Sequence, residues 1–287
     1  LVMWVEVIAL AVLLARLETV RIRENAKEVQ EYNCAGREQE GAQKGNGKRE
    51  EKTVSDKVIG ARNRRSEKKL EDTLEKNVTE KKKAALTFDD GPGPYTEKLL
   101  DILDRYNVKA TFFVTNGKPD YQNLIAQEAQ RGHTVAIHSA SHDYAKIYQS
   151  VDAYFADFDE MNSIITAQTG KAADLVRFPG GSSNTISKKY CYGIMSQLVC
   201  AVEERGFRYC DWNVSSGDAG GTTSTSQVVA NVIAGIKGNN VSVVLQHDIK
   251  NFSVDAVEQI IQWGLSEGYT FLPITSTTPM SHHGINN

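Results

Sequence analysis

The sequence lacks several features that define common functional classes. No apolar run reaches the roughly 20 residues that a helix needs to cross a bilayer. Positive charge is not in excess, since 33 Lys and Arg stand against 36 Asp and Glu, and nothing in this balance suggests a nucleic-acid-binding protein. The four cysteines fit no CxxC metal spacing, so we expect no disulfide framework and a small core residue at Cys210.

Two segments of unusual composition open the chain. Residues 1–16 are apolar except for Glu6 and Arg16, and we expect a truncated membrane anchor or signal segment there, with a short amphipathic leader as the alternative. Residues 17–83 carry 18 Lys and Arg, 14 Asp and Glu and few aromatics. Such a segment buries too little apolar surface to offset its chain entropy, so it predicts a flexible or partly helical linker.

From residue 84 onward, short apolar runs alternate with amphipathic stretches, a pattern typical of parallel α/β folds. The expected strands are AALTF, ATFFV, TVAIH, DLVRF, FRYCDW, VSVVLQH and YTFLP. The expected helices cover 95–106, 121–130, 151–169, 189–205, 226–237 and 254–267. About 200 residues can close such units into a small barrel or spread them as a doubly wound sheet, and both place a site at the carboxyl ends of the strands.

Polar residues gather at those strand ends. In chain order they are Asp89, Asp90, His138, His142, Arg177, Asp211, Asp218, His247 and Asp248. Two imidazoles and one carboxylate form a metal set that leaves coordination positions open for water or substrate. Zinc is the usual occupant, although Co²⁺, Ni²⁺ or Mn²⁺ also suit such ligands.

The adjacent carboxylates Asp89 and Asp90 then have separate tasks. One binds the metal while the other takes a proton from a water on that metal, and strand alternation permits Asp90 and Asp89 in these respective roles. Arg177 would keep the base ionised and oriented. His247 would protonate a leaving group, with Asp218 or Asp248 raising its pKa. The constellation predicts metal-assisted hydrolysis of an acyl bond.

The ordered motifs TFDDGP, HSASH, RFPGG, SGD and LQHD resemble those of the polysaccharide deacetylases, carbohydrate esterase family 4, also called the NodB-homology domain. The resemblance covers about residues 84–275 and leaves 276–287 as a C-terminal tail. It implies a deformed (β/α) barrel of seven to eight parallel strands. It also implies removal of N-acetyl groups from N-acetylglucosamine polymers, or of O-acetyl groups from xylan in some members.

Residue roles carry over from this resemblance motif by motif. Asp89 is then the catalytic base, Arg177 its orienting partner and His247 the catalytic acid. The metal ligands are Asp90, His138 and His142. Leu245 would line a pocket for the acetyl methyl group, although an ordinary core residue would look the same.

The fourth motif admits two alignments. One takes Asp211 and Trp212 as its centre, whereas we favour Asp218 as the residue that supports His247, with Asp211 and Trp212 back on the strand. Ala219 then replaces an aromatic residue that usually walls the substrate groove. Gly180 likewise stands where many members have Tyr, but its backbone N–H remains suited to an oxyanion hole. We therefore count Gly180, Gly181, Leu245 and Trp212 as substrate-binding candidates.

The resulting hypothesis is a metal-dependent deacetylase outside a bacterial cell, tethered to the membrane by residues 1–16. Its expected substrate is peptidoglycan or chitooligosaccharide. The alternatives are an O-acetyl esterase acting on xylan or a similar polysaccharide and, as a different class, a non-catalytic glycan-binding domain. His282 and His283 are expected to be incidental residues of an exposed tail, and the sequence indicates no oligomeric state.

Overall fold

The computed structural model describes residues 82–287. The expected anchor at 1–16 and nearly all of the expected linker at 17–83 therefore lie outside the described residues. Within the described part of the chain, no helix is both long and apolar enough to cross a membrane.

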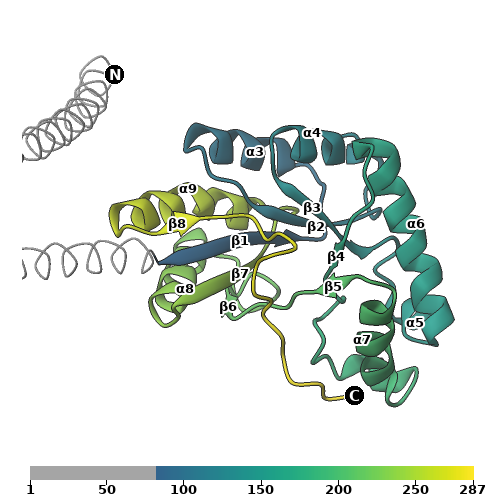
Figure 1. Cartoon of the computed structure of the whole chain (residues 1–287). Coiled ribbons are helices and arrows are strands. Elements are labelled where there is room, and N and C mark those ends of the chain that lie inside the picture. The colour runs from purple at the N-terminus through teal and green to yellow at the C-terminus, as the bar shows by residue number, and fades with distance from the viewer. Residues whose placement is uncertain (1–81) are drawn as a thin grey trace, which may run out of the picture. The chain divides into compact units, whose positions relative to one another are not determined.

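Strands and helices alternate along the described chain (Figure 1). The strands are β1 (Lys83–Asp89), β2 (Thr111–Thr115), β3 (Thr134–Ser139), β4 (Leu175–Val176), β5 (Arg208–Tyr209), β6 (Val214–Ser215), β7 (Val241–His247) and β8 (Thr270–Phe271). The α-helices are α3 (Thr96–Arg105), α4 (Leu124–Gln130), α5 (Tyr144–Ile147), α6 (Val151–Thr169), α7 (Ile194–Glu204), α8 (Thr225–Lys237) and α9 (Asn251–Ser266). Two 3₁₀ turns, η2 (Pro119–Tyr121) and η3 (Ile186–Lys189), complete the set.

All strand pairings in the sheet are parallel, in the order β5-β4-β3-β2-β1-β7-β6, with β8 paired to the start of β1. The prediction of seven to eight parallel strands in an α/β fold is confirmed. Laid flat, the two edge strands would stand about 29 Å apart, at about 4.8 Å per strand. The five residue steps from Tyr209 to Val214 reach at most about 18 Å. The sheet must therefore curl, and it forms an open half-barrel (Figure 1).

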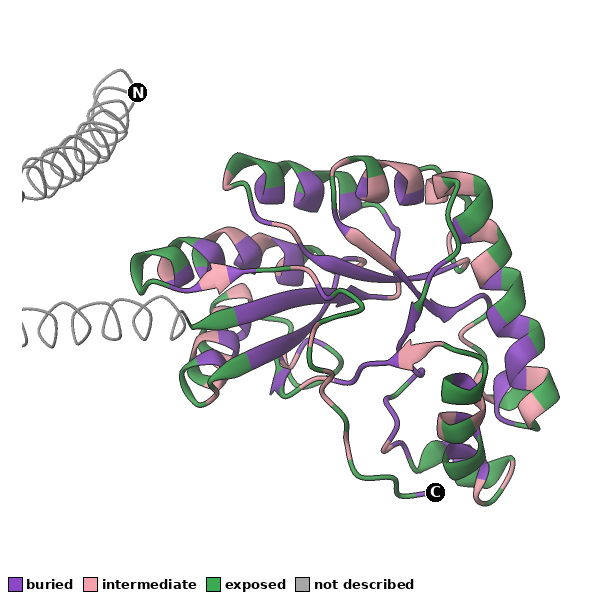
Figure 2. Cartoon of the chain, in the orientation of Figure 1, coloured by how far each residue is buried: buried purple, intermediate pink, exposed green. Residues whose placement is uncertain are grey.

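Side-chain alternation gives the curled sheet two different faces. Residues such as Leu86, Phe88 and Phe112 point outward and pack beneath the helices in the larger core cluster. The inner face holds a smaller cluster, which consists of Ala85, Phe113, Ala136, Leu175, Cys210, Val243 and Ile274. Figure 2 shows the strands buried along most of their length. Polar residues two positions further along these strands therefore also face inward.

Only Arg208–Tyr209 of the expected strand FRYCDW is a strand in the structure, and Val214–Ser215, just beyond it, forms a second short strand that the sequence did not predict. Arg208–Tyr209 pairs with β4 at one edge of the sheet, and Val214–Ser215 pairs with β7 at the other. The residues between them cross the gap, so they cannot belong to a single strand. The expected helix 189–205 is shorter for a different reason: Gly193, with φ of 77°, separates η3 from α7.

The C-terminal tail makes specific contacts with the domain, although His282 and most other tail residues are exposed, as expected. His282 stacks on Tyr209 with ring centroids 3.9 Å apart and donates from Nε2 to the Tyr209 carbonyl oxygen at 3.0 Å. Asn287 is only 8% exposed. Cys210 is a buried core residue, as expected, and the three cysteines of the described part are free thiols.

Candidate metal centre and active site

The chemistry-bearing residues meet at the carboxyl end of the curled sheet. In the register between β1 and β7, Asp89 stands directly opposite His247. His138 lies near the end of β3, two residues beyond inward-facing Ala136. Strand alternation and sheet curl together bring these side chains onto one concave surface.

Asp90, His138 and His142 form a cluster suited to a metal ion, with one ligand atom of each within 4.8 Å of the others. The Asp90 Oδ1 atom lies 3.5 Å from His138 Nε2 and 3.4 Å from His142 Nε2. Two ligands on a tetrahedral zinc ion stand about 3.3–3.4 Å apart at bond lengths of about 2.0–2.1 Å. Asp90 Oδ1 is also buried without a hydrogen-bond partner. The residues present therefore fit a divalent cation.

The ring of His138 is prepared as a ligand by its surroundings. Its Nδ1 donates to the Arg177 carbonyl oxygen at 2.7 Å, which leaves the Nε2 lone pair facing Asp90. Burial lowers the pKa of His138 and outweighs the nearby carboxylates Asp89 and Asp90. A neutral imidazole with a free Nε2 is the form that binds a metal.

Two of the three ligands have unusual backbone geometry. Asp90 has φ of 71° and His142 has φ of 52°, both in the left-handed region that residues other than glycine rarely adopt. Thr115 Oγ1 donates to the Asp90 carbonyl oxygen at 2.9 Å and helps hold that turn. Burial raises the pKa of Asp90, but the imidazoles of His138, His142 and His247 outweigh this and lower it. Asp90 is therefore a carboxylate, ready to ligate.

Asp157, on the inner side of α6, holds the loop between the two histidine ligands, and our sequence interpretation missed it. Its Oδ2 accepts from the Ser139 hydroxyl and, at 2.8 Å, from the Ala140 N–H. Its Oδ1 accepts from the Ser141 hydroxyl and, at 2.9 Å, from the Ser141 N–H. Only the amphipathic pattern of the helix hinted that Asp157 faces inward, and no motif marked it.

Asp89 forms a buried ion pair with Arg177. Arg177 Nη1 donates to Asp89 Oδ1 at 2.8 Å, and the two side chains are 0% and 4% exposed. The guanidinium also donates to Thr87 Oγ1 and to the carbonyl oxygens of Cys210 and Asp211. The second Asp89 oxygen lies 4.0 Å from His138 Nε2, so it faces the metal cluster.

His247 stands on the other side of that cluster, with Nε2 3.8 Å from Asp90 Oδ2. The ring Nδ1 of His247 is hydrogen-bonded to Asp218 Oδ1 at 2.8 Å, and the backbone N–H of His247 donates to Asp218 Oδ2 at 2.8 Å. Burial alone would lower the pKa of His247, but the hydrogen bond and charge of Asp218 outweigh it and raise the pKa. Asp211 instead accepts from Ser182 and from the His283 N–H.

Asp248, the other carboxylate considered for His247, is buried beside α3 and hydrogen-bonded to Thr96. Burial raises the pKa of Asp248 to about 7. Of the three carboxylates near the fourth and fifth motifs, Asp218 is the one in contact with the imidazole of His247.

The four substrate-binding candidates occupy different environments. Gly180 is exposed and its N–H donates to no described residue, whereas the Gly181 N–H donates to the Phe178 carbonyl oxygen at 2.7 Å. Leu245 is 5% exposed on β7, two residues before His247. Trp212 packs against the Gly181 backbone and lies 5.7 Å from the Arg177 guanidinium, behind the ion pair.

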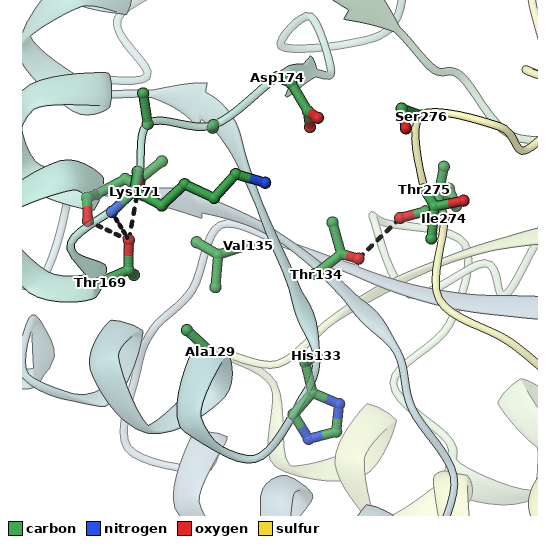
Figure 3. A pocket seen from close by; sticks show the side chains of 13 residues that line it. Ala129, His133, Thr134, Val135, Thr169, Lys171, Asp174, Ile274, Thr275 and Ser276 are labelled. Atoms are coloured by element: carbon green, nitrogen blue, oxygen red, sulfur yellow. Dashed lines mark hydrogen bonds between the residues drawn. The ribbon is translucent and has the colours of Figure 1, made fainter.

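A separate pocket of about 350 Å³ lies at the opposite end of the sheet (Figure 3). It is lined by His133 and Thr134 at the start of β3, and by Lys171, Asp174 and Thr275 from the loops nearby. None of the predicted site residues lines it. The metal cluster, not this pocket, therefore holds the candidate chemistry.

Comparison with known proteins agrees with this geometry. Residues 76–192 match the family described as Polysaccharide deacetylase. A peptidoglycan-N-acetylglucosamine deacetylase of Bacillus cereus is 34% identical over 201 residues, which cover 68% of this chain and 70% of the relative.

Two solved structures are similar as well. One is the catalytic domain of a peptidoglycan N-acetylglucosamine deacetylase from Eubacterium rectale, with 69% identity, a TM-score of 0.72, and coverage of 72% of this chain and 94% of that one. The other is a polysaccharide deacetylase from Bacillus cereus, with 33% identity, a TM-score of 0.61, and coverage of 71% and 96%.

The four hydrogen bonds to Asp157 predict an effect on metal affinity. In Asp157→Asn, an amide NH₂ would face a backbone N–H of the histidine loop, so the loop loses its geometry. We expect zinc affinity, measured by competition with a chelating dye, to fall roughly 10- to 100-fold. The control is Asp159→Asn on the same helix, which alters only an exposed ion pair with Arg205. Equal zinc affinity in the two variants would contradict the role of Asp157.

Proposed function

The chain belongs to the polysaccharide deacetylase family, and from this premise we propose that it removes N-acetyl groups from N-acetylglucosamine residues of peptidoglycan. Hydrolytic deacetylation itself is the activity that the family membership and the site share. The observation that carries the proposed mechanism is the arrangement of two pairs of groups around the metal cluster. One pair is Asp89 with Arg177, and the other is His247 with Asp218. The two pairs lie on different sides of the three candidate metal ligands.

The chain's own residues divide the chemistry. A divalent cation held by Asp90, His138 and His142 would polarise the acetyl carbonyl and lower the pKa of a water ligand. Asp89 takes the proton of the attacking water, and Arg177 fixes the carboxylate in the geometry for that transfer. His247, whose pKa is raised by the hydrogen bond and charge of Asp218, donates its Nε2 proton to the departing amine nitrogen. The free Gly180 N–H is a donor for the carbonyl oxygen.

Zinc is the proposed metal, because its tetrahedral spacing matches the separations of 3.4 and 3.5 Å around Asp90 Oδ1. Peptidoglycan is the proposed substrate, because relatives named for that substrate are 34% and 69% identical to this chain. A relative named as a bifunctional xylanase/deacetylase is 32% identical, so acetylated xylan belongs in the test as the competing substrate.

The proposed substrate implies a location and a division of the chain. Peptidoglycan lies outside the cytoplasmic membrane, so we place the activity at the bacterial cell surface. In this proposal the apolar residues 1–16 anchor the chain and residues 17–83 act as a tether. The catalytic domain at 84–275 can then reach the wall polymer. The tail at 276–287 packs against the catalytic domain.

Acetate release by the full-length chain tests the proposal. The chain is purified metal-free and assayed on peptidoglycan, chitooligosaccharide and acetylated xylan, with and without added zinc. We expect zinc-dependent acetate from the two N-acetylglucosamine substrates. Acetate from xylan alone would overturn the N-deacetylase assignment, and no acetate from any substrate by the zinc-loaded chain would overturn the enzyme assignment for these glycans.

Substitution of the proposed base separates catalysis from metal binding. Asp89→Asn keeps the volume of the side chain but cannot accept a proton from water. We expect kcat to fall roughly 10²- to 10⁴-fold while the metal content remains at the parent level. Asp90→Asn serves as the comparison, since it removes a ligand and should lower the metal content as well. Elemental analysis and initial rates distinguish the two, and near-parent turnover in Asp89→Asn would disprove the base role.

The pH profile reports on His247 and Asp218. A general acid works only below its pKa, so the raised pKa of His247 extends activity toward higher pH. Asp218→Asn removes the charge that raises this pKa, and the basic limb of kcat/KM should move to lower pH. By linkage, the stability gained from protonating His247 is full below the ordinary value of about 6.5 and is lost as pH rises through the folded pKa. An unchanged basic limb would refute the pairing as the source of the shift.

A further inference from the structure

Gly180 occupies a position that no larger residue can take without displacing a tyrosine. Its φ is 77°, a conformation that glycine adopts freely. A Cβ atom built at this position would stand 2.6 Å from the Tyr144 hydroxyl oxygen and 3.4 Å from Tyr144 Cζ. The space that a side chain at 180 would enter is thus filled by the phenol of Tyr144, which comes from a different element of the fold.

Tyr144 is fixed in place by the metal-binding loop. It is the first residue of α5 and follows the ligand His142 by two positions. Its ring meets the His142 ring edge to face, with centroids 5.6 Å apart, and meets the Tyr148 ring at 5.4 Å. The Tyr148 hydroxyl donates to the Pro179 carbonyl oxygen at 2.7 Å, which ties this aromatic row to the residue just before Gly180.

The Tyr144 hydroxyl is a free donor beside the reacting centre. It makes no hydrogen bond with any described residue, and it is not among the buried polar atoms that lack a partner, so solvent reaches it. A tyrosine hydroxyl ordinarily titrates at about pH 10, well above neutrality. The phenol therefore keeps its proton. The neighbouring Gly180 N–H is also without an acceptor in the described chain.

Because two unused donors of different elements converge beside the metal ligands, we propose that the Tyr144 hydroxyl is a second hydrogen-bond donor to the carbonyl oxygen of the scissile acetamide, alongside the Gly180 N–H. The assignment rests on the proposed deacetylase function. It makes Tyr144 a catalytic residue, since its hydroxyl touches the atom on which negative charge develops. It also explains the glycine at position 180, because the absence of a side chain there leaves room for the phenol of Tyr144 from α5.

The kinetic test uses Tyr144→Phe, which keeps the ring against His142 and removes only the hydroxyl. Loss of one hydrogen bond to a developing charge should lower kcat roughly 10- to 100-fold, with KM and zinc content within about twofold of the parent. The matched control is Tyr192→Phe, which removes the hydroxyl of a tyrosine that is 84% exposed and should leave kcat unchanged. A rise in KM with unchanged kcat would show that the hydroxyl holds the sugar instead, and would overturn the assignment.

A second measurement does not depend on the glycan. The zinc-loaded chain is titrated with sodium acetate by calorimetry, and we expect roughly 10-fold weaker binding in Tyr144→Phe than in the parent and in Tyr192→Phe. If the parent releases no acetate from any glycan but this difference persists, the proposed function fails, while the Tyr144 hydroxyl is still shown to donate to a ligand oxygen at the metal cluster. If acetate affinity and kcat are both unchanged, the donor assignment fails and the function stands.

The close approach itself can be checked through stability. Gly180→Ala should lower the melting temperature, because the new methyl group meets the Tyr144 oxygen and the backbone is held at positive φ. In the Tyr144→Phe background the oxygen is gone, so Gly180→Ala should cost less. An equal loss in both backgrounds would show that the phenol does not occupy the space at Gly180, and would overturn the geometry on which the proposal stands.

Discussion

The buried contact between Arg177 and Asp89 connects the fold to the chemistry. In the sheet, β1 and β5 are separated by three strands, yet the guanidinium donates both to Thr87 and Asp89 of β1 and to the Cys210 and Asp211 carbonyl oxygens just after β5. Only a curled sheet brings these acceptors within reach of one side chain. A fully buried ion pair contributes little net stability, because desolvation offsets its Coulomb attraction. Its value here is that it fixes the position of Asp89.

At the metal cluster, hydrogen bonds hold two residues in an unfavourable backbone conformation. Asp90 and His142 both have positive φ, a geometry that costs of order 1 kcal/mol or more at residues other than glycine. Asp157 and Thr115 supply hydrogen bonds to the two loops that contain these residues. Of the three described non-glycine residues with positive φ, two are therefore candidate metal ligands, and the third, Asn107, lies in the turn after α3.

The proposed substrate-contacting groups and the proposed catalytic groups come from different kinds of segment. Catalytic groups come from the ends of buried strands, where packing restricts their movement. The two proposed donors to the acetyl carbonyl oxygen come instead from connecting segments, Gly180 from the loop after β4 and Tyr144 from the short helix after the histidine loop. In the structure, the Tyr144 phenol fills the space that a side chain at position 180 would enter.

The sequence alone determined the class of fold and the core of the site. Alternating apolar runs and amphipathic stretches predicted a parallel α/β domain. Polar residues at strand ends predicted that the three candidate metal ligands would lie together with Asp89, Arg177 and His247, because parallel strands all end at one side of a sheet. The structure brings these side chains together, and each expectation depended on a local pattern. Residues 1–81 lie outside the described structure, so the anchor and the linker remain sequence predictions.

Only the tertiary structure decided which residues are partners. The motif alignment favoured Asp218 over Asp211 as the partner of His247, and the structure shows that, of Asp211, Asp218 and Asp248, Asp218 is the one hydrogen-bonded to the imidazole. The early end of the expected strand 207–212 at Tyr209, and the separate edge strand at Val214–Ser215, follow from the curl of the sheet, which no local pattern records. Asp157, Tyr144 and the docked tail were missed for the same reason. Each acts on residues that are distant in sequence or on another element, and their spacing along the chain carries no sign of that contact.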